Sequence, residues 1–173
     1  LNNHTPSFSL QYNSAKRYGQ LGYGWSLGGF SYITRCSKKV KDGDEVMSGV
    51  SFSNNDRLCM DGKRLLQVNK NNETSYWSDG AQYRFDIDGR ISVSKVSDNE
   101  FIFVDVNGIE VTYKKINPKT WGVSESKDAF GNKITYNYQE DNLKALLPLP
   151  KSVDYGRYSV EFDYFKGRND MFA

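Results

Sequence analysis

The sequence predicts an all-β protein in which antiparallel hairpins and meanders form a twisted sheet, a sandwich or a partial shell, with little helix. Three observations support this fold class. Aromatic residues make up 14% of the 173 residues, and strands favour aromatic side chains. Pairs such as Asp-Gly and Asn-Gly recur at the short spacing of hairpin-built proteins. Between these pairs, apolar and polar residues alternate with the period of two that marks a half-buried strand.

The alternating segments follow one another along the whole chain. They lie at residues 7–12, 30–35, 83–87, 91–93, 102–104, 109–113, 133–138 and 158–164. The last segment alternates so strictly that we expect one buried face and one wet face. Only residues 142–147, which are followed by Pro148, suit a helix, and they would form about one and a half turns.

Turn chemistry joins several of these strands. Asp88-Gly89 and Asn107-Gly108 are predicted to be two-residue hairpin turns, with positive φ at both residues of each pair. The acids near residues 42–45 and 86–88 lie in similar turn-forming strings. The string DIDG resembles part of a calcium loop, but it lacks the first ligand and the flanking helices. We therefore expect solvated turn residues at these places and no metal site.

The stretch LGYGWSLGG at residues 21–29 raises the question of catalysis, because it contains the G-x-S-x-G pattern of serine hydrolases around Ser26. The chain has a single histidine, His4, which precedes the serine, whereas hydrolases place it after. A strand-like segment, rather than a helix, follows the motif. We therefore predict that Ser26 is not a nucleophile and that the chain has no catalytic residues.

The same stretch is better explained as an aromatic-anchored tight loop. Glycine suits backbone with positive φ, and a large ring whose polar group finds a partner can be buried. We expect Trp25 to fill a pocket. The residues assigned to this structural loop are Gly22, Tyr23, Gly24, Trp25 and Gly28.

Composition limits the partners. The chain has 23 basic and 21 acidic residues and a net charge of +2, which gives no strong attraction for nucleic acid. No apolar run is long enough for a membrane-spanning helix. Leu1 begins no signal-peptide pattern. We interpret residues 1–173 as a single β-rich domain cut from a larger protein, and we expect the isolated piece to self-associate through an edge strand.

Longer motifs carry a resemblance to a known family. They are LGYGWSLGGFSYITRC at 21–36, NNDRLCMDGKRLL at 54–66, YRFDIDGRI at 83–91, DVNGIEVTY at 105–113, DAFGNKITYNY at 128–138 and LPKSVDYGRYSVEFDYFKGRND at 149–170. In this order they resemble the SpvB amino-terminal domain family of bacterial virulence proteins and of the B components of insecticidal toxin complexes. DAFGNKITYNY also resembles the tyrosine-aspartate (YD) repeats of Rhs proteins, in which Asp128, Gly131 and Asn132 would form the turn between two strands.

The resemblance implies a non-catalytic structural domain. Such domains belong to large secreted toxins in which strands wind into a shell that encloses or delivers an effector. The implied partners are the rest of the same polypeptide and the other toxin-complex subunits, and the implied location is extracellular. The ADP-ribosyltransferase motifs of the virulence branch are not present in this sequence. No cofactor is implied.

Two alternatives remain open in the sequence. Cys36 and Cys59 both lie in the family-like motifs and are a candidate disulfide, but a chain that folds in a reducing cytoplasm before export would keep free thiols. Two cysteines and a distant histidine do not match zinc-ligand spacing. The alternative function is a carbohydrate-binding or host-protein-binding β module. An exposed, coplanar pair among Trp25, Trp77 and Trp121 would favour carbohydrate.

Overall fold

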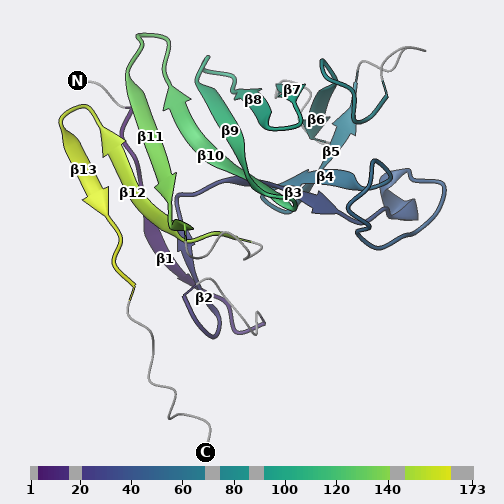
Figure 1. Ribbon diagram of the computed structural model, residues 1–173, viewed down its shortest axis with the longest axis horizontal. Coiled ribbons are helices and arrows are strands. Elements are labelled where there is room, and N and C mark those ends of the chain that lie inside the picture. Colours follow the sequence, from purple (N-terminus) through teal and green to yellow (C-terminus); the bar gives the residue numbers. More distant parts are fainter. Residues whose placement is uncertain (1–3, 16–20, 69–74, 86–91, 141–146, 165–173) are drawn as a thin grey trace, which may run out of the picture.

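The computed structural model describes residues 4–15, 21–68, 75–85, 92–140 and 147–164 (Figure 1). Apart from one short 3-10 helix, its regular elements are all strands, so the predicted all-β class is confirmed. The elements are β1 (Ser9–Tyr12), β2 (Trp25–Gly28), β3 (Tyr32–Cys36), η1 (Val40–Asp42), β4 (Arg57–Met60), β5 (Lys63–Gln67), β6 (Gln82–Phe85), β7 (Ser92–Ser97), β8 (Glu100–Val104), β9 (Glu110–Asn117), β10 (Thr120–Lys127), β11 (Lys133–Tyr138), β12 (Pro150–Tyr155) and β13 (Tyr158–Glu161).

Eight antiparallel strands close into a barrel. Their order is β10-β3-β4-β5-β6-β7-β8-β9, and β9 pairs with β10 to complete the circle. Most neighbours are also consecutive in sequence, as in a meander. The exception is the pairing of β10 with β3, in which Trp121 lies opposite Ile33. This long-range contact closes the barrel.

Strand β10 belongs both to the barrel and to the sheet that extends from it. Its first half pairs with β3, whereas Glu125–Lys127 pairs with β11 and so leads out of the barrel. Strands β11, β12 and β13 continue from there as an antiparallel extension. Gly122 lies where β10 changes partner, and a Cβ atom there would overlap Ile116 and Tyr138. The glycine therefore lets Tyr138 cross β10, where its hydroxyl donates a hydrogen bond to the Val123 carbonyl at 2.9 Å.

The barrel core takes a large apolar residue from every one of its strands. These residues are Ile33, Leu58, Met60, Leu65, Tyr83, Val93, Phe101, Tyr113, Trp121 and Val123, joined by Trp77 and Ala81 from the β5–β6 connection. The inward residues alternate with outward ones, which is the period of two seen in the sequence. No helix in the described ranges is long and apolar enough to cross a membrane.

A smaller aromatic cluster holds the two-stranded β1–β2 sheet against the extension. Phe8 lies 5.5 Å from Phe30 and 5.4 Å from Phe162, measured between ring centroids. Phe30 also meets Tyr136 of β11 edge to face at 5.9 Å. Edge-to-face aromatic contacts of this kind add to the gain from burial. The N-terminal strands are thereby fixed beside β11 and β13.

Two turns share the pattern D-x-x-G. The Asp105 carboxylate accepts hydrogen bonds from the amides of Asn107 and Ile109, and the Asp128 carboxylate accepts them from Phe130 and Asn132. In each turn the glycine N–H donates to the carbonyl of the aspartate. Gly108 has φ 77° and Gly131 has φ 86°. The turn predicted for Asp128, Gly131 and Asn132 lies at this second position.

The predicted geometry of the Asn107-Gly108 turn is wrong in one respect. Gly108 has positive φ, but Asn107 does not. The turn begins at Asp105, whereas a two-residue turn at Asn107-Gly108 would begin at Val106. One left-handed residue, Gly108, is therefore enough to close it. The predicted turn at Asp88-Gly89, and almost all of the candidate helix at residues 142–147, lie outside the described residues.

Candidate functional site

The residues of the hydrolase-like motif do not come together. Ser26 lies in β2 and pairs with Gln11 of β1. The only histidine, His4, is instead 3.2 Å from the Ser126 carbonyl and 3.3 Å from the Ser126 hydroxyl. Strand β3, rather than a helix, follows the motif. The arrangement at Ser26 therefore supplies neither the base nor the strand-turn-helix that an activated serine needs.

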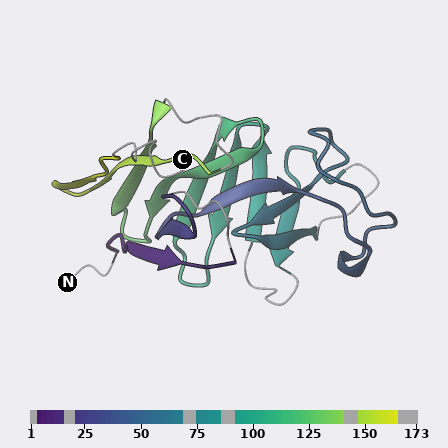
Figure 2. The same ribbon diagram turned by 90° about the horizontal axis from the view of Figure 1, so that it is seen from below.

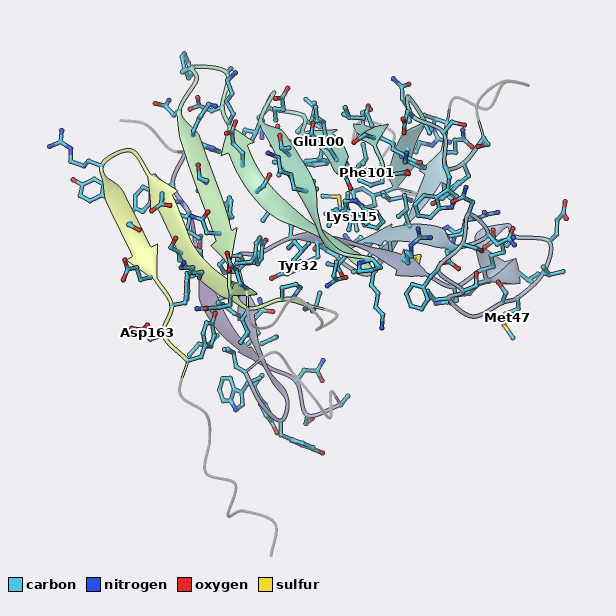
Figure 3. The ribbon with its side chains drawn as sticks, in the orientation of Figure 1. Tyr32, Met47, Glu100, Phe101, Lys115 and Asp163 are labelled. Atoms are coloured by element: carbon cyan, nitrogen blue, oxygen red, sulfur yellow. A yellow bond between two sulfur atoms is a disulfide. The ribbon has the colours of Figure 1, made fainter. Side chains whose placement is uncertain are left out.

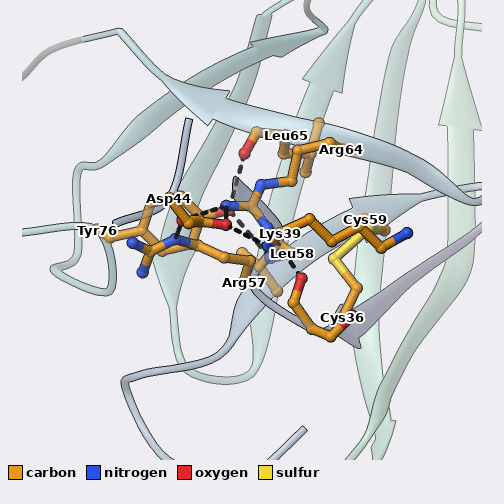
Figure 4. The surroundings of a disulfide bond; sticks show 10 residues. Cys36, Lys39, Asp44, Arg57, Leu58, Cys59, Arg64, Leu65 and Tyr76 are labelled. Carbon is orange, nitrogen blue, oxygen red and sulfur yellow. Dashed lines mark hydrogen bonds and ion pairs between the residues drawn. A yellow bond between two sulfur atoms is a disulfide. The ribbon is translucent and has the colours of Figure 1, made fainter. Parts of the chain in front are cut away.

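A disulfide joins Cys36 at the end of β3 to Cys59 in β4, with the Cα atoms 5.8 Å apart (Figure 4). The two strands are already hydrogen-bonded neighbours, so the bridge closes the base of the connection between them. For the sequence separation of 23, such a bridge contributes about 3 kcal/mol of stability. We call residues 37–56, which the bridge encloses, the β3–β4 loop.

A buried carboxylate anchors the loop to the barrel beside the disulfide. Asp44 accepts a hydrogen bond from Arg57 at 2.8 Å, from Arg64 at 2.9 Å and from the Lys39 amide at 2.9 Å. Figure 4 shows both guanidinium groups converging on it. The Arg57 guanidinium also lies 4.7 Å from the centre of the Tyr76 ring. The loop therefore cannot lift away without breaking a buried ion pair.

Charge and burial act in opposite directions on Asp44. Burial raises the pKa of the carboxyl, but the Lys39 amide and the two guanidinium groups outweigh it, so that the pKa lies below 3.8. Asp44 is thus ionised at neutral pH. The expectation that the acids at residues 42–45 are solvated turn residues is wrong for Asp44. Its charge is matched by Arg57 and Arg64, which leaves little reason for a cation to bind there.

A second carboxylate braces the other end of the loop. Asp56 accepts hydrogen bonds from the Ser51 amide at 2.7 Å and from Arg35 at 3.2 Å. The Arg35 guanidinium stacks 4.3 Å above the Trp77 ring, and the Trp77 N–H donates to the Asp56 carbonyl at 2.9 Å. Burial again raises the pKa of Asp56, but Ser51 and Arg35 bring it below its usual value. Both ends of the loop are therefore tied to the barrel.

The predicted aromatic loop is instead part of an exposed two-stranded sheet. Trp25 is the first residue of β2, is 44% exposed and pairs with Tyr12 of β1. The prediction that Trp25 fills a pocket is wrong, because β1 and β2 pair only with each other among the described residues and leave this ring toward solvent. Tyr23 is also exposed. Gly22 and Gly24 do have positive φ, whereas Gly28 is an ordinary strand residue that Ser9 and Gln11 crowd.

The three tryptophans do not form a flat platform for a sugar. Trp77 and Trp121 are buried in the barrel, where the Trp121 N–H donates to the Asp98 carbonyl at 3.0 Å. The exposed Trp25 ring meets Tyr12 at 5.2 Å, but with an interplanar angle of 51°. Because a sugar stacks on a flat or coplanar surface, this arrangement gives the carbohydrate alternative little support.

A cleft of about 600 Å³ lies where the β10–β11 and β12–β13 turns meet the N-terminal segment. Several of its polar side chains already have partners. Asn132 donates to Asp128, Lys133 pairs with Glu125, and Asp154 accepts from Asn137. The cleft therefore offers few unengaged groups that could select a ligand.

The extension ends in a strand with one open edge. Strand β13 pairs with β12 only, among the described residues. The Phe162 amide donates to the Lys151 carbonyl, and Val160 lies opposite Val153. By the alternation of an antiparallel ladder, the amides of Ser159 and Glu161 point away from β12. Figure 2 shows this extension and the β3–β4 loop at opposite ends of the molecule.

Comparison with known proteins identifies the fold. No protein-family model matches the sequence, and no curated protein sequence matches it. A solved structure does match: the N-terminal domain of effector protein SpvB from Salmonella typhimurium strain LT2, with a TM-score of 0.60 and 19% identity. The match covers 92% of this chain and 62% of that chain. The chain therefore has the fold of the SpvB N-terminal domain and spans less than two thirds of its length.

Proposed function

We propose that this chain is a non-catalytic structural domain of a secreted bacterial toxin or virulence protein. In this proposal it contributes strands to a larger β structure, built with the rest of its own polypeptide, that encloses or delivers an effector. The fold of a bacterial effector's N-terminal domain supports the proposal. We extend it to shells like those of insecticidal toxin complexes and Rhs proteins, because the D-x-x-G turn at Asp128 suits their repeats.

The observation that carries the proposal is the open edge of β13. An edge strand presents unpaired N–H and C=O groups, and isolated proteins usually cover or twist such an edge. Here the outward amides of Ser159 and Glu161 have no neighbouring strand in the described part of the chain. A strand from elsewhere in the parent polypeptide would pair with them. The barrel would then act as the rigid base from which the extension reaches into the shell.

We expect the isolated chain to self-associate through β13, and Glu161→Pro to weaken that association. Proline removes the outward amide hydrogen at an edge position while it leaves the inward bonds to β12 in place. Sedimentation velocity over a wide concentration range measures the effect. Glu161→Ala is the matched control, because it removes the same carboxylate but keeps the N–H, and it should associate like the parent chain.

Two results would contradict the edge proposal. One is a chain that stays monomeric at every concentration. The other is an association that both variants leave unchanged, because another surface would then be responsible.

A further inference from the structure

The β3–β4 loop exposes apolar side chains although it is firmly held. Its large apolar residues, with their exposed fractions, are Val40 at 62%, Val46 at 60%, Met47 at 79%, Val50 at 40% and Phe52 at 50%. Figure 3 shows Met47 at the outer end of the loop, on the far side of the molecule from Asp163. Several exposed apolar side chains on one projecting loop are typical of an interaction surface.

The exposure is a built feature of the loop. The Cys36–Cys59 disulfide closes its base, and Lys38 and Ser48 exchange backbone hydrogen bonds across it. Asp44, two residues before the exposed Val46, is fixed by Arg57 and Arg64. Phe52 has φ 59°, a conformation that a bulky residue rarely adopts unless its surroundings impose it. The loop therefore presents these side chains in a fixed position.

Four lysines belong to the β3–β4 loop or lie beside it. Lys38, Lys39 and Lys41 belong to the loop, and Lys119 places its ammonium group 5.1 Å from the Phe52 ring. Four acids lie in the loop, but Asp44 and Asp56 are matched by partly buried arginines. In the sequence, the loop's other two acids, Asp42 and Glu45, are outnumbered by its three lysines. Together with Lys119 and the arginines that match Asp44 and Asp56, the loop region therefore has an excess of basic residues.

We propose that the β3–β4 loop binds the surface of an anionic lipid bilayer. Val46 and Met47 enter the boundary between headgroups and acyl chains, and the lysines contact lipid phosphates. Apolar residues beside clustered lysines are the combination that binds such surfaces. Protein interfaces favour Tyr, Trp, Phe, Met and Arg and are depleted of Lys, so it is the lysines beside the apolar residues that favour lipid over protein. The exposed Tyr12 and Trp25 of the β1–β2 sheet, and Tyr23 just before β2, are instead of the residue types that protein interfaces favour.

The test is co-sedimentation of the full chain with vesicles of phosphatidylcholine alone or mixed with phosphatidylglycerol. We expect binding to the anionic vesicles only, and weaker binding when the salt rises from about 0.1 M to about 1 M, which shortens the screening length to about 3 Å. Met47→Asp should lower the partition coefficient about tenfold or more. Phe130→Asp is the matched control, because Phe130 is 91% exposed in the β10–β11 turn, and it should bind like the parent chain.

Thermal unfolding of Met47→Asp is measured alongside and should match the parent chain, because the side chain is almost fully outside the fold. A parent chain that ignores anionic vesicles would overturn the proposal. So would equal binding by the parent chain and Met47→Asp. If Met47→Asp changes how the chain sediments alone but does not change its binding to vesicles, the loop contacts protein and the lipid proposal is wrong. The edge variants at Glu161 do not enter this experiment, so the two proposals fail independently.

Discussion

We expect Asp44→Asn to lower the free energy of unfolding by about 3 to 5 kcal/mol, the usual cost of breaking a buried ion pair by removing one partner. The substitution keeps the shape of the side chain but leaves Arg57 and Arg64 close together without their counter-charge. The Asp44 side chain is only 4% exposed, so water cannot replace what is lost. Urea unfolding followed by tryptophan fluorescence measures the change.

The matched control is Asp154→Asn. Asp154 is exposed and accepts hydrogen bonds from Asn137 and Ser159, so its loss should cost less than about 1 kcal/mol. Equal effects of the two variants would show that the loop is not anchored through Asp44.

The effect of Asp44 should also depend on pH. Its pKa in the folded chain lies below the usual 3.8, so the carboxylate stabilises the fold fully above about pH 4. That contribution is lost as the pH falls through the lowered pKa. The difference in free energy of unfolding between the parent chain and Asp44→Asn should therefore become smaller in acid. A difference that stays constant at low pH would contradict the stabilising role of the Asp44 carboxylate.

The same substitution at two tryptophans should have very different results. Trp121→Ala is expected to cost about 3 to 5 kcal/mol, because it removes a large ring from the barrel core. Trp121 is 1% exposed and meets Phe101 edge to face at 5.3 Å. Trp25→Ala should cost less than about 1 kcal/mol, because that ring is largely outside the core.

Urea unfolding monitored by far-ultraviolet circular dichroism compares the two variants without relying on the deleted fluorophore. If Trp25→Ala were as costly as Trp121→Ala, the β1–β2 sheet would have to be buried against the rest of the protein. If Trp121→Ala were nearly silent, the ring could not be part of the barrel core.

The fold class could be predicted from the sequence because it depends on local patterns. Period-two alternation and Asp-Gly or Asn-Gly turns are properties of neighbouring residues. Closure of the barrel depends instead on the pairing of β10 with β3, in which Gly122 lies opposite Tyr32. Nothing near either residue in the sequence indicates the other, so a barrel could not be distinguished from an open sheet or a sandwich.

The burial and the partners of individual loop residues were harder to predict from the sequence, for the same reason. Asp44 lies in a DGDE string that is typical of solvated turns, and its partners Arg57 and Arg64 follow 13 and 20 residues later. Trp25 lies between glycines, and that local pattern fits a buried ring and an exposed ring equally well. The apolar tip of the β3–β4 loop left a readable signal, since Val46, Met47, Val50 and Phe52 gather within a few residues of a turn.

The central claim is that the edge of β13 is completed by a strand from the rest of the parent polypeptide. The most direct test is residue-resolved amide hydrogen exchange at Ser159 and Glu161, measured in the dilute isolated chain and in the full-length protein. We predict fast exchange at both amides in the isolated chain, slow exchange at Val160 in both forms, and strong protection of Ser159 and Glu161 in the full-length protein. Exchange at Ser159 and Glu161 that stays fast in the full-length protein would contradict the claim.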